Sequence, residues 1–338
     1  MKAKKVTQIL ATLVFALVMA VSVSTTSKAA YAITQAAQTP DSITVALDKT
    51  AIVSGSGYAL ANWTITLQKQ GENYSWVDVQ PAVALDPNAT TYTFVGLAPG
   101  AKYQARIDYT LTYTYRGKTE TKAPRNSTQY IYTAPGKVTG VNQSKWWYYI
   151  ESVDFAWDNQ DACKYEWVAF QGKKQVANGA DVYGNSGSFK IKNNKLYTVQ
   201  VRAYEDINGV RVYGDWSDTA YLFTQPMIER KTGNISVDGS GKMHIKWGKI
   251  SGVSGYEVYV STKEKSGYKR VAKVKAKKGS VTVKKLGKKK FKKNKTYFVY
   301  VVAKKKVGGI TYTSGRHYST MYKKGSNTVR WSFDGTGK

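Results

Sequence analysis

One pattern recurs three times along this chain and constrains its fold more than any other feature. An alternating apolar strand is followed by a strand that begins with tyrosine and then by a glycine turn. The tyrosines are Tyr103, Tyr197 and Tyr297, so the steps are 94 and 100 residues, the length of one β-sandwich domain. The alternating strands contain Ile43/Val45/Leu47, Val153/Phe155/Trp157 and Met243/Ile245/Trp247, and the turns contain Gly117, Gly209 and Gly309. The sequence therefore predicts a string of small all-β domains, which usually hold, space or bind other molecules rather than catalyse.

The N-terminus is typical of a secretory signal peptide. Three lysines within the first five residues precede an almost wholly apolar stretch, Ile9–Val23, and Ala30-Tyr31-Ala32 supplies the small residues that a signal peptidase reads. The apolar stretch is shorter than the ~18–20 residues of a membrane span. We therefore expect residues 1–32 to be cleaved and the mature chain to be secreted, without a membrane span.

The chain has a single cysteine, Cys163, so no intrachain disulfide can form in an exported protein. Stability must come from packing, and the 26 Tyr and 9 Trp suit the half-buried surfaces of β-sheets. Because no histidine is close to Cys163 in the sequence, we interpret it as a small loop or core residue rather than a reactive thiol.

Prolines and short connections indicate where one domain ends and the next begins. Pro40, Pro135 and Pro226 each lie near the start of an expected sandwich, where a residue without a backbone N–H suits an edge strand. The predicted segments are the signal peptide (1–32), a short N-terminal segment (33–39), three sandwiches (40–134, 135–225 and 226–324) and a C-terminal tail (325–338). The tail carries Trp331 and Phe333, and it is expected to be either a last edge strand or disordered.

Several motifs give these domains a resemblance to one family. The run Leu97–Tyr103, Leu-Ala-Pro-Gly-Ala-Lys-Tyr, resembles the fibronectin type III motif before the sixth strand, whose tyrosine hydrogen-bonds to upstream backbone. Trp157 with Tyr165, and Trp247 with Tyr256, match the family's core tryptophan and the aromatic residue that starts its third strand. The third domain is the most similar, and it resembles the repeats of secreted Gram-positive, clostridial-type surface proteins.

The first domain departs from this pattern in two places. Leu47 stands where the tryptophan is expected, and the hairpin arm after Tyr103 is two residues longer than in the other domains. The resemblance covers most of residues 40–324. It implies three tandem fibronectin type III-like (immunoglobulin-like) β-sandwiches that serve adhesion, spacing or surface contact, with no cofactor and no chemistry of their own.

The positive charge is concentrated in the third domain. Residues 226–338 hold 29 Lys and Arg against 5 Asp and Glu, a balance of +24, whereas residues 33–225 hold 18 against 17. So much like charge on one small domain opposes its folding, and this cost favours a functional reason for the lysines.

The basic residues fall in two loops of the predicted topology. One loop joins the fifth and sixth strands of the third domain and the other joins its third and fourth strands, and both belong to the same pole of the sandwich. We therefore predict one polyanion-binding surface, made of Lys284, Lys285, Lys288, Lys289, Lys290, Lys292, Lys293, Lys295, Lys263, Lys265, Lys269 and Arg270. A second basic group, expected nearer the opposite pole, contains Lys273, Lys275, Lys277, Lys278, Lys304, Lys305 and Lys306.

The partner expected for this surface is an anionic cell-wall polymer or glycan. A protein is held at an anionic surface by ~1 kcal/mol per nearby lysine, without a shaped pocket. The alternative is that lysines only keep a sandwich soluble and block edge-to-edge pairing. Lysine rather than arginine argues against specific nucleic-acid recognition. The sequence does not identify any protein partner.

A row of aromatic residues offers a different function. In an extended Trp146-Trp147-Tyr148-Tyr149, alternate side chains face opposite ways, so two of the four rings meet solvent or a neighbouring domain. Trp146 and Trp147 are candidates for stacking on a polysaccharide. The simpler interpretation is a contribution to the core or to a domain border. A carbohydrate-binding or enzyme-associated set of domains that recognises neutral polysaccharide is therefore the alternative function.

No catalytic or metal motif is found in the sequence. His244 alternates with apolar neighbours and is expected to point outward, and His317 has no partner at a metal-ligand spacing. Asp154, Asp158 and Asp161 form the only local group of carboxylates, which we interpret as outward residues of a strand and its loop rather than a calcium site. We expect no enzyme activity, no metal and no cofactor.

Overall fold

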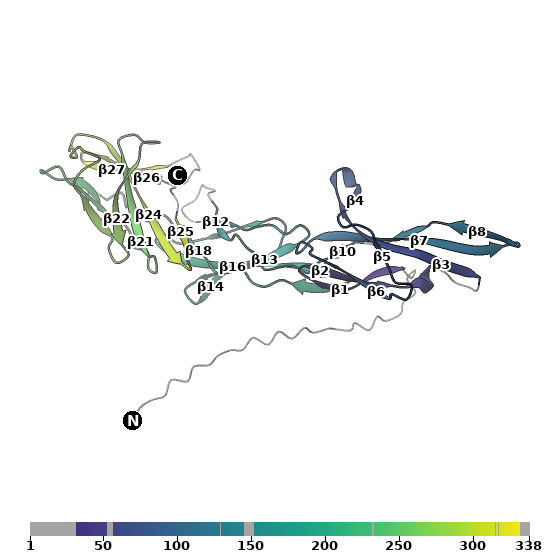
Figure 1. The fold of residues 1–338 in the computed structure, drawn as a ribbon. Coiled ribbons are helices and arrows are strands. Elements are labelled where there is room, and N and C mark those ends of the chain that lie inside the picture. The colour runs from purple at the N-terminus through teal and green to yellow at the C-terminus, as the bar shows by residue number, and fades with distance from the viewer. Residues whose placement is uncertain are drawn as a thin grey trace, which may run out of the picture.

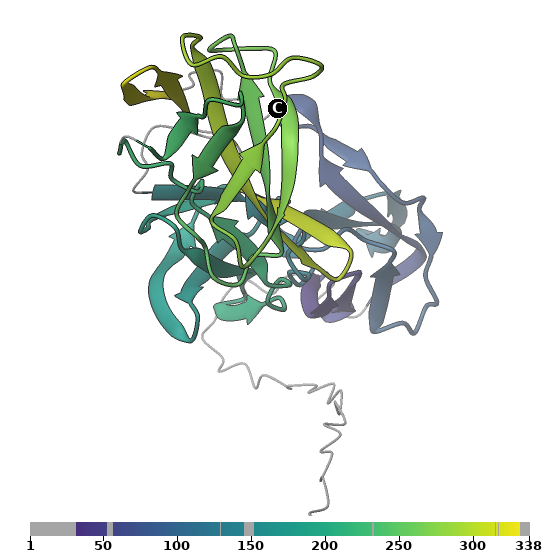
Figure 2. The same cartoon turned by 90° about the vertical axis from the view of Figure 1, so that its left-hand side faces the viewer.

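The described chain is built almost entirely of β-strands. The computed structural model describes residues 32–52, 57–128, 130–144, 152–231, 233–314, 316 and 318–331. Within these ranges there is no α-helix, and the only helical turns are the short 3₁₀ segments η1 (Lys49–Ala51) and η2 (Glu72–Tyr74). Three sandwiches follow one another along an elongated molecule (Figure 1), and Figure 2 looks along it from the third toward the first. The expected signal peptide lies outside the described residues except for Ala32.

Ten strands form the first sandwich. They are β1 (Ile33–Thr39), β2 (Ser42–Leu47), β3 (Tyr58–Gln70), β4 (Trp76–Asp78), β5 (Val83–Ala84), β6 (Thr91–Val95), β7 (Lys102–Tyr115), β8 (Lys118–Lys122), β9 (Arg125–Ser127) and β10 (Ile131–Tyr132). One sheet has the order β1-β2-β6. The other has the order β10-β7-β3-β4, with β5 beside β3 and with β8 and β9 beside β7.

The second sandwich repeats this plan with fewer strands. Its strands are β11 (Asn142–Gln143), β12 (Ser152–Ala156), β13 (Lys164–Gln171), β14 (Lys174–Val182), β15 (Ser186–Lys190), β16 (Leu196–Ile207), β17 (Val210–Tyr213) and β18 (Ala220–Phe223). The smaller sheet has the order β11-β12-β15. The larger has the order β14-β13-β16, and the other edge of β16 pairs with β18 near its start and with β17 near its end.

The third sandwich has the same strand order and one strand more. It contains β19 (Ile235–Val237), β20 (Met243–Lys246), β21 (Gly255–Ser261), β22 (Lys269–Lys275), β23 (Ser280–Val283), β24 (Tyr297–Val307), β25 (Ile310–Thr313), β26 (Tyr318–Lys323) and β27 (Ser326–Trp331). The sheet β19-β20-β23 faces the sheet β22-β21-β24-β26-β27, in which β25 also pairs with β24. Antiparallel sheets of three and at least four strands in this order are the fibronectin type III-like arrangement expected from the sequence.

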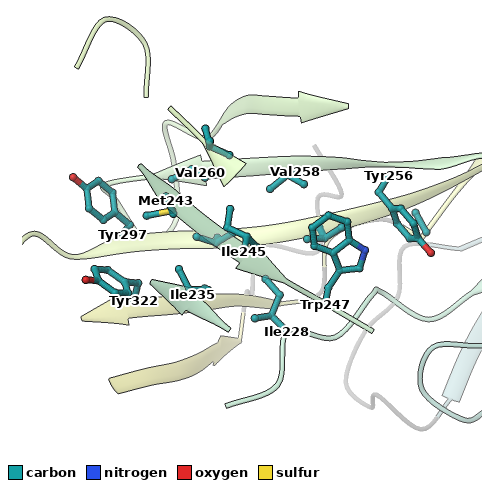
Figure 3. Packing of buried hydrophobic residues seen from close by; sticks show 14 of the residues in the cluster. Ile228, Ile235, Met243, Ile245, Trp247, Tyr256, Val258, Val260, Tyr297 and Tyr322 are labelled. Atoms are coloured by element: carbon teal, nitrogen blue, oxygen red, sulfur yellow. The ribbon is translucent and has the colours of Figure 1, made fainter. Parts of the chain in front are cut away.

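Each sandwich has its own core, filled by the inward residues of the alternating strands. In the third, Trp247, directly after β20, packs against Tyr256 of β21 with ring centroids 5.4 Å apart (Figure 3), and in the second Trp157 packs against Tyr165 at 5.2 Å. In the first sandwich the core tryptophan comes from another strand. Trp63 of β3 is 4% exposed and stacks on Tyr109 at 5.0 Å.

The three repeated tyrosines perform the same structural role. The hydroxyl oxygen of Tyr103 accepts a hydrogen bond from the backbone N–H five residues earlier, at Ala98, over 3.2 Å. Tyr197 and Tyr297 accept the equivalent bonds, from Lys192 at 2.8 Å and from Lys292 at 2.9 Å. This is the tyrosine corner that the resemblance implied.

Both ends of the sandwich region differ from the expected segmentation. The segment 33–39, expected to precede the first sandwich, is its strand β1, because Ile33 is 2% exposed in the core and the strand pairs with β2. Pro40 consequently lies in the turn between β1 and β2 rather than at a domain entry. The C-terminal tail from residue 325 contributes the edge strand β27, which was one of its two expected forms, and β27 pairs with β26 along its whole length, so the third sandwich extends beyond residue 324.

Polar bonds and aromatic contacts join neighbouring sandwiches. Between the first and second, Lys69 Nζ lies 2.7 Å from Asp161 Oδ2, and the Ala162 backbone N–H donates to the Gly100 carbonyl over 2.8 Å. Between the second and third, the Tyr312 ring from β25 meets the Tyr221 ring from β18 at 5.3 Å. Such contacts restrict the motion of one sandwich against the next.

Candidate functional site

The densest lysine run forms the loop between β23 and β24, where it was expected. Leu286 and Lys289 form a β-bridge, with backbone hydrogen bonds of 2.9 and 3.3 Å, and Gly287 makes the turn with a φ of +63°. Phe291 is the apolar residue that holds the loop, since it is 3% exposed and its ring lies 5.2 Å from that of Tyr297. Phe291 therefore anchors the loop to the core of the sandwich, while the lysine side chains of the loop remain exposed to solvent.

The second basic segment lies at the same pole of the sandwich. Lys263 and Lys265 lie in the loop between β21 and β22, and Lys269 and Arg270 begin β22. The last residue of β21 pairs with the second residue of β24, so this loop and the β23–β24 loop lie at the same end of their sheet. A Cβ placed on Gly287 would lie 3.8 Å from Lys269 Nζ, so the two loops are neighbours.

The predicted residues of this surface, which we call the basic pole, are all solvent-exposed. They are Lys263, Lys265, Lys269, Arg270, Lys284, Lys285, Lys288, Lys289, Lys290, Lys292, Lys293 and Lys295. Arg270 Nη1 lies 2.9 Å from Glu257 Oε1. Among the residues that the structure describes, none of the eleven lysines forms an ion pair, so their charges remain available to an anionic partner.

Glu257 fixes one edge of the basic pole from beneath. Its side chain is almost fully buried, and besides Arg270 it binds Lys304 Nζ at 2.8 Å and accepts a hydrogen bond from the Tyr259 hydroxyl over 2.7 Å. Burial alone raises the pKa of this carboxyl, but the hydrogen bonds from Lys304 and Tyr259 outweigh it and hold the pKa below its ordinary value. Glu257 is therefore ionised at neutral pH and orients both cations.

The second basic group forms a hollow that sequence reasoning did not identify. Gly255, at the start of β21, pairs with Lys275 on one side and Lys304 on the other, so these lysines lie at the other end of the sheet from the basic pole. Between them is a hollow of about 720 Å³, lined also by Lys273 and Lys306. The signal in the sequence is the alternation in β22, which places Lys273 and Lys275 on one face.

The remaining candidate residues from the sequence, where the structure describes them, are hydrogen-bonded or buried. His244 Nε2 lies 2.9 Å from Asp238 Oδ2, and its Nδ1 lies 3.0 Å from the Thr282 hydroxyl. Trp146, Trp147 and His317 lie outside the described residues. Burial raises the pKa of the Cys163 thiol to about 12, so this thiol is protonated at neutral pH.

The three aspartates of the second sandwich do not come together as ligands. Asp158 accepts a hydrogen bond from the Thr139 hydroxyl over 2.8 Å, Asp161 pairs with Lys69, and Asp154 lies on β12. No group of three or more His, Cys, Asp or Glu residues that could hold a metal ion occurs in the described ranges. In the same ranges, no helix has the length and apolar character needed to cross a membrane.

Comparison with known proteins gives similarity of structure only. No family model and no curated protein sequence matches the chain. A solved structure of the FN1–FN3 domains of chicken CNTN1 is similar at 15% identity and a TM-score of 0.32, over 89% of this chain and 97% of that one. A two-domain fibronectin type III segment of chicken tenascin is similar at 11% identity and a TM-score of 0.28, over 57% and 98%. By its own strand order and cores, the protein consists of three tandem fibronectin type III-like β-sandwiches.

Proposed function

We propose that this is an exported, non-catalytic surface or adhesion protein, and that its third sandwich retains it on anionic cell-wall polymers or glycans. The observation that carries the proposal is the basic pole: twelve exposed basic residues from two adjacent loops, of which eleven have no ion pair among the described residues. The first two sandwiches, close to neutral, then extend away from the wall as spacer or adhesive domains.

Physical chemistry favours a polyanion over a small ligand at this surface. The twelve basic side chains of the basic pole are all exposed, and its longer loop is anchored by buried Phe291, so the surface presents charge to solvent. Attraction of ~1 kcal/mol per lysine near an anionic surface is enough for six to eight lysines to localise a protein. Because such attraction is screened over ~8 Å at physiological salt, binding must weaken as salt is added.

Edge protection alone accounts for only part of this arrangement. Lysines on an edge strand such as β22 do block pairing with other chains. The lysines of the β23–β24 loop, however, are outside the strands and protect no edge. Their clustering is therefore better explained by an anionic partner.

Elution of the full chain from immobilised polyanions tests the proposal. The chain is applied to purified wall teichoic acid and to heparin, each on agarose, and is eluted with a NaCl gradient. We expect retention that Lys288→Gln, Lys289→Gln and Lys290→Gln together reduce, whereas Lys118→Gln and Lys122→Gln in the first sandwich do not. Equal elution of both variants and the wild type would exclude the basic pole as the binding surface. The order of elution from the two resins distinguishes phosphate-rich from sulfated polymers.

A further inference from the structure

The junction of the first and second sandwiches contains a groove that the proposed function does not use. Its volume is about 530 Å³, within the ~300–1,000 Å³ of small-ligand sites. One wall is the hairpin from β3 to β4, which stands off the side of the molecule (Figure 1), and the other comes from the second sandwich. Six of its lining residues carry the argument: Lys69, Tyr74, Lys102, Tyr132, Asp161 and Glu205.

Bonds across the junction hold the groove open in one shape. The ion pair of Lys69 with Asp161, at 2.7 Å, joins its two walls, and the backbone bond from Ala162 to Gly100 lies beside it. The Gln35 side chain fixes Tyr132 by donating to its carbonyl over 2.7 Å and accepting from its N–H over 2.9 Å. A groove formed in advance spares a ligand the cost of ordering it.

Tyr74 stands at the rim of the groove in an unusual backbone conformation. Asn73 and Tyr74 have φ values of +57° and +59°, a region that bulky residues seldom adopt. The Tyr74 side chain is 85% exposed, so no burial of its ring compensates for this conformation. Backbone of this kind is concentrated at ligand-binding sites.

Glu205 supplies to the groove a carboxylate that has no ion pair among the described residues. It is half-buried, and burial raises the pKa of its carboxyl above the ordinary value. In the described part of the chain no lysine, arginine or histidine lies within ion-pair distance of it. Lys102 is close by on the first sandwich, with its Nζ 4.2 Å from the centre of the Tyr130 ring. The groove thus offers a carboxylate acceptor, an ammonium donor and aromatic faces.

These groups identify the class of ligand by their chemistry. Two lysines and two carboxylates leave the groove without net charge, so a polyanion gains nothing there. Sugar hydroxyls can donate to the Glu205 carboxylate and accept from Lys102, while the apolar face of a sugar ring can lie on an aromatic side chain. We propose that the junction groove binds a segment of neutral saccharide through Tyr74, Tyr132, Glu205 and Lys102. This site is distinct from the basic pole.

Calorimetric titration of the full mature chain with neutral hexasaccharides tests this proposal. The probes are cellohexaose, xylohexaose, mannohexaose and chitohexaose. Each is brought to about 1 mM, so that a Kd of ~1 mM or lower is detectable. We expect at least one of them to bind, with the same affinity at low and high NaCl. Glu205→Gln removes the charged acceptor and Tyr74→Asn removes the ring while keeping a residue suited to positive φ, and each should weaken binding about tenfold.

Two controls separate this site from other effects. Tyr115→Asn changes another exposed tyrosine at the far end of β7, ~40 Å from Lys102 by the rise of a strand, and should leave affinity unchanged. The Lys288→Gln, Lys289→Gln, Lys290→Gln variant should also bind as wild type. The proposal is overturned if none of the four saccharides binds, or if Tyr74→Asn and Glu205→Gln both bind a saccharide as tightly as the wild type does.

Discussion

The hydroxyl oxygen of Tyr297 accepts a hydrogen bond from the backbone N–H of Lys292 over 2.9 Å. Tyr297 begins β24, the strand that crosses the third core, and Lys292 lies in the loop that carries the densest lysine run. The bond therefore ties the core of the sandwich to the basic pole. A repeated fold element, the tyrosine corner, thus determines where the charge is presented.

Removing this hydroxyl should loosen the loop without changing the core. Tyr297→Phe keeps the buried ring and deletes one hydrogen bond, which costs ~1 kcal/mol of stability in the third sandwich. We expect faster hydrogen exchange at the Lys292 amide, measured by NMR. The matched Tyr197→Phe variant should affect the Lys192 amide and leave Lys292 unchanged. Unaltered exchange at Lys292 would show that the bond does not hold the loop.

Deleting the apolar residue beneath the loop should have a larger effect. Phe291→Ala removes a ring that is 3% exposed, and truncations of this kind cost ~3–5 kcal/mol. The third sandwich should then unfold at lower urea concentration, followed by tryptophan fluorescence. Leu286→Ala, at a half-buried position in the same loop, should cost clearly less. Equal effects would mean that Phe291 does not hold the loop.

Gly100 should report on the junction of the first two sandwiches. A Cβ at this residue would overlap Cys163 Sγ across the junction, and its φ of +57° adds strain. Gly117→Ala is the control, because it has a φ of +76° but no atom within 4 Å of the added carbon. Both changes should cost ~1 kcal/mol or more for φ alone. Gly100→Ala should lower the stability measured by thermal unfolding more than Gly117→Ala does. An equal or smaller loss would argue against close packing of Gly100 on Cys163 across the junction.

The Cys163 thiol should be unreactive in the folded chain. Its pKa is raised from 9.0 to about 12 by burial, so the thiolate is scarce at pH 8. We expect slow reaction with a disulfide reagent in the native protein and fast reaction in guanidinium. Since the folded state favours the neutral thiol, its contribution to stability is present below pH 9.0 and is lost as pH rises toward about 12. Cys163→Ala should remove that alkaline loss, and a native thiol as reactive as the unfolded one would contradict this account.

Glu257 should make the third sandwich sensitive to acid. Its pKa is below the ordinary value in the folded state, so its contribution is present above the unfolded pKa and is lost as pH falls through the folded one. Protonation removes the partner of both Arg270 and Lys304. The stability of Glu257→Gln should be lower at neutral pH and less dependent on pH in the acid range. Parallel pH profiles for the variant and the wild type would be inconsistent with this role.

The sequence predicted those parts of the fold that depend on local pattern. Alternation along β16 and the glycine turn at Gly209 are set within a few residues, so strands and hairpins could be located. Trp63 was missed as a core residue, because it faces inward only after an irregularity between Ala61 and Thr64 that includes Asn62 with a φ of +52°. β1 was missed because Ile33 is its only buried residue.

The candidate sites differ in how far sequence could reach them. The basic pole is made of two continuous segments, so composition and topology were enough to bring them together. The junction groove combines Tyr74, Lys102 and Glu205, which are far apart in the chain and meet only through the arrangement of two sandwiches. No periodicity or motif marks such residues in advance.

Co-sedimentation with purified Gram-positive cell walls tests the central claim most directly. The full mature chain and its variant with glutamine at the eleven lysines of the basic pole are mixed with walls across a NaCl series. We predict that the wild type pellets at low salt and is released by ~0.5 M NaCl, where the screening length is only a few ångströms, while the variant stays in solution throughout. Pelleting of the folded variant to the same extent as the wild type would contradict the claim, as would wild-type pelleting that is indifferent to salt.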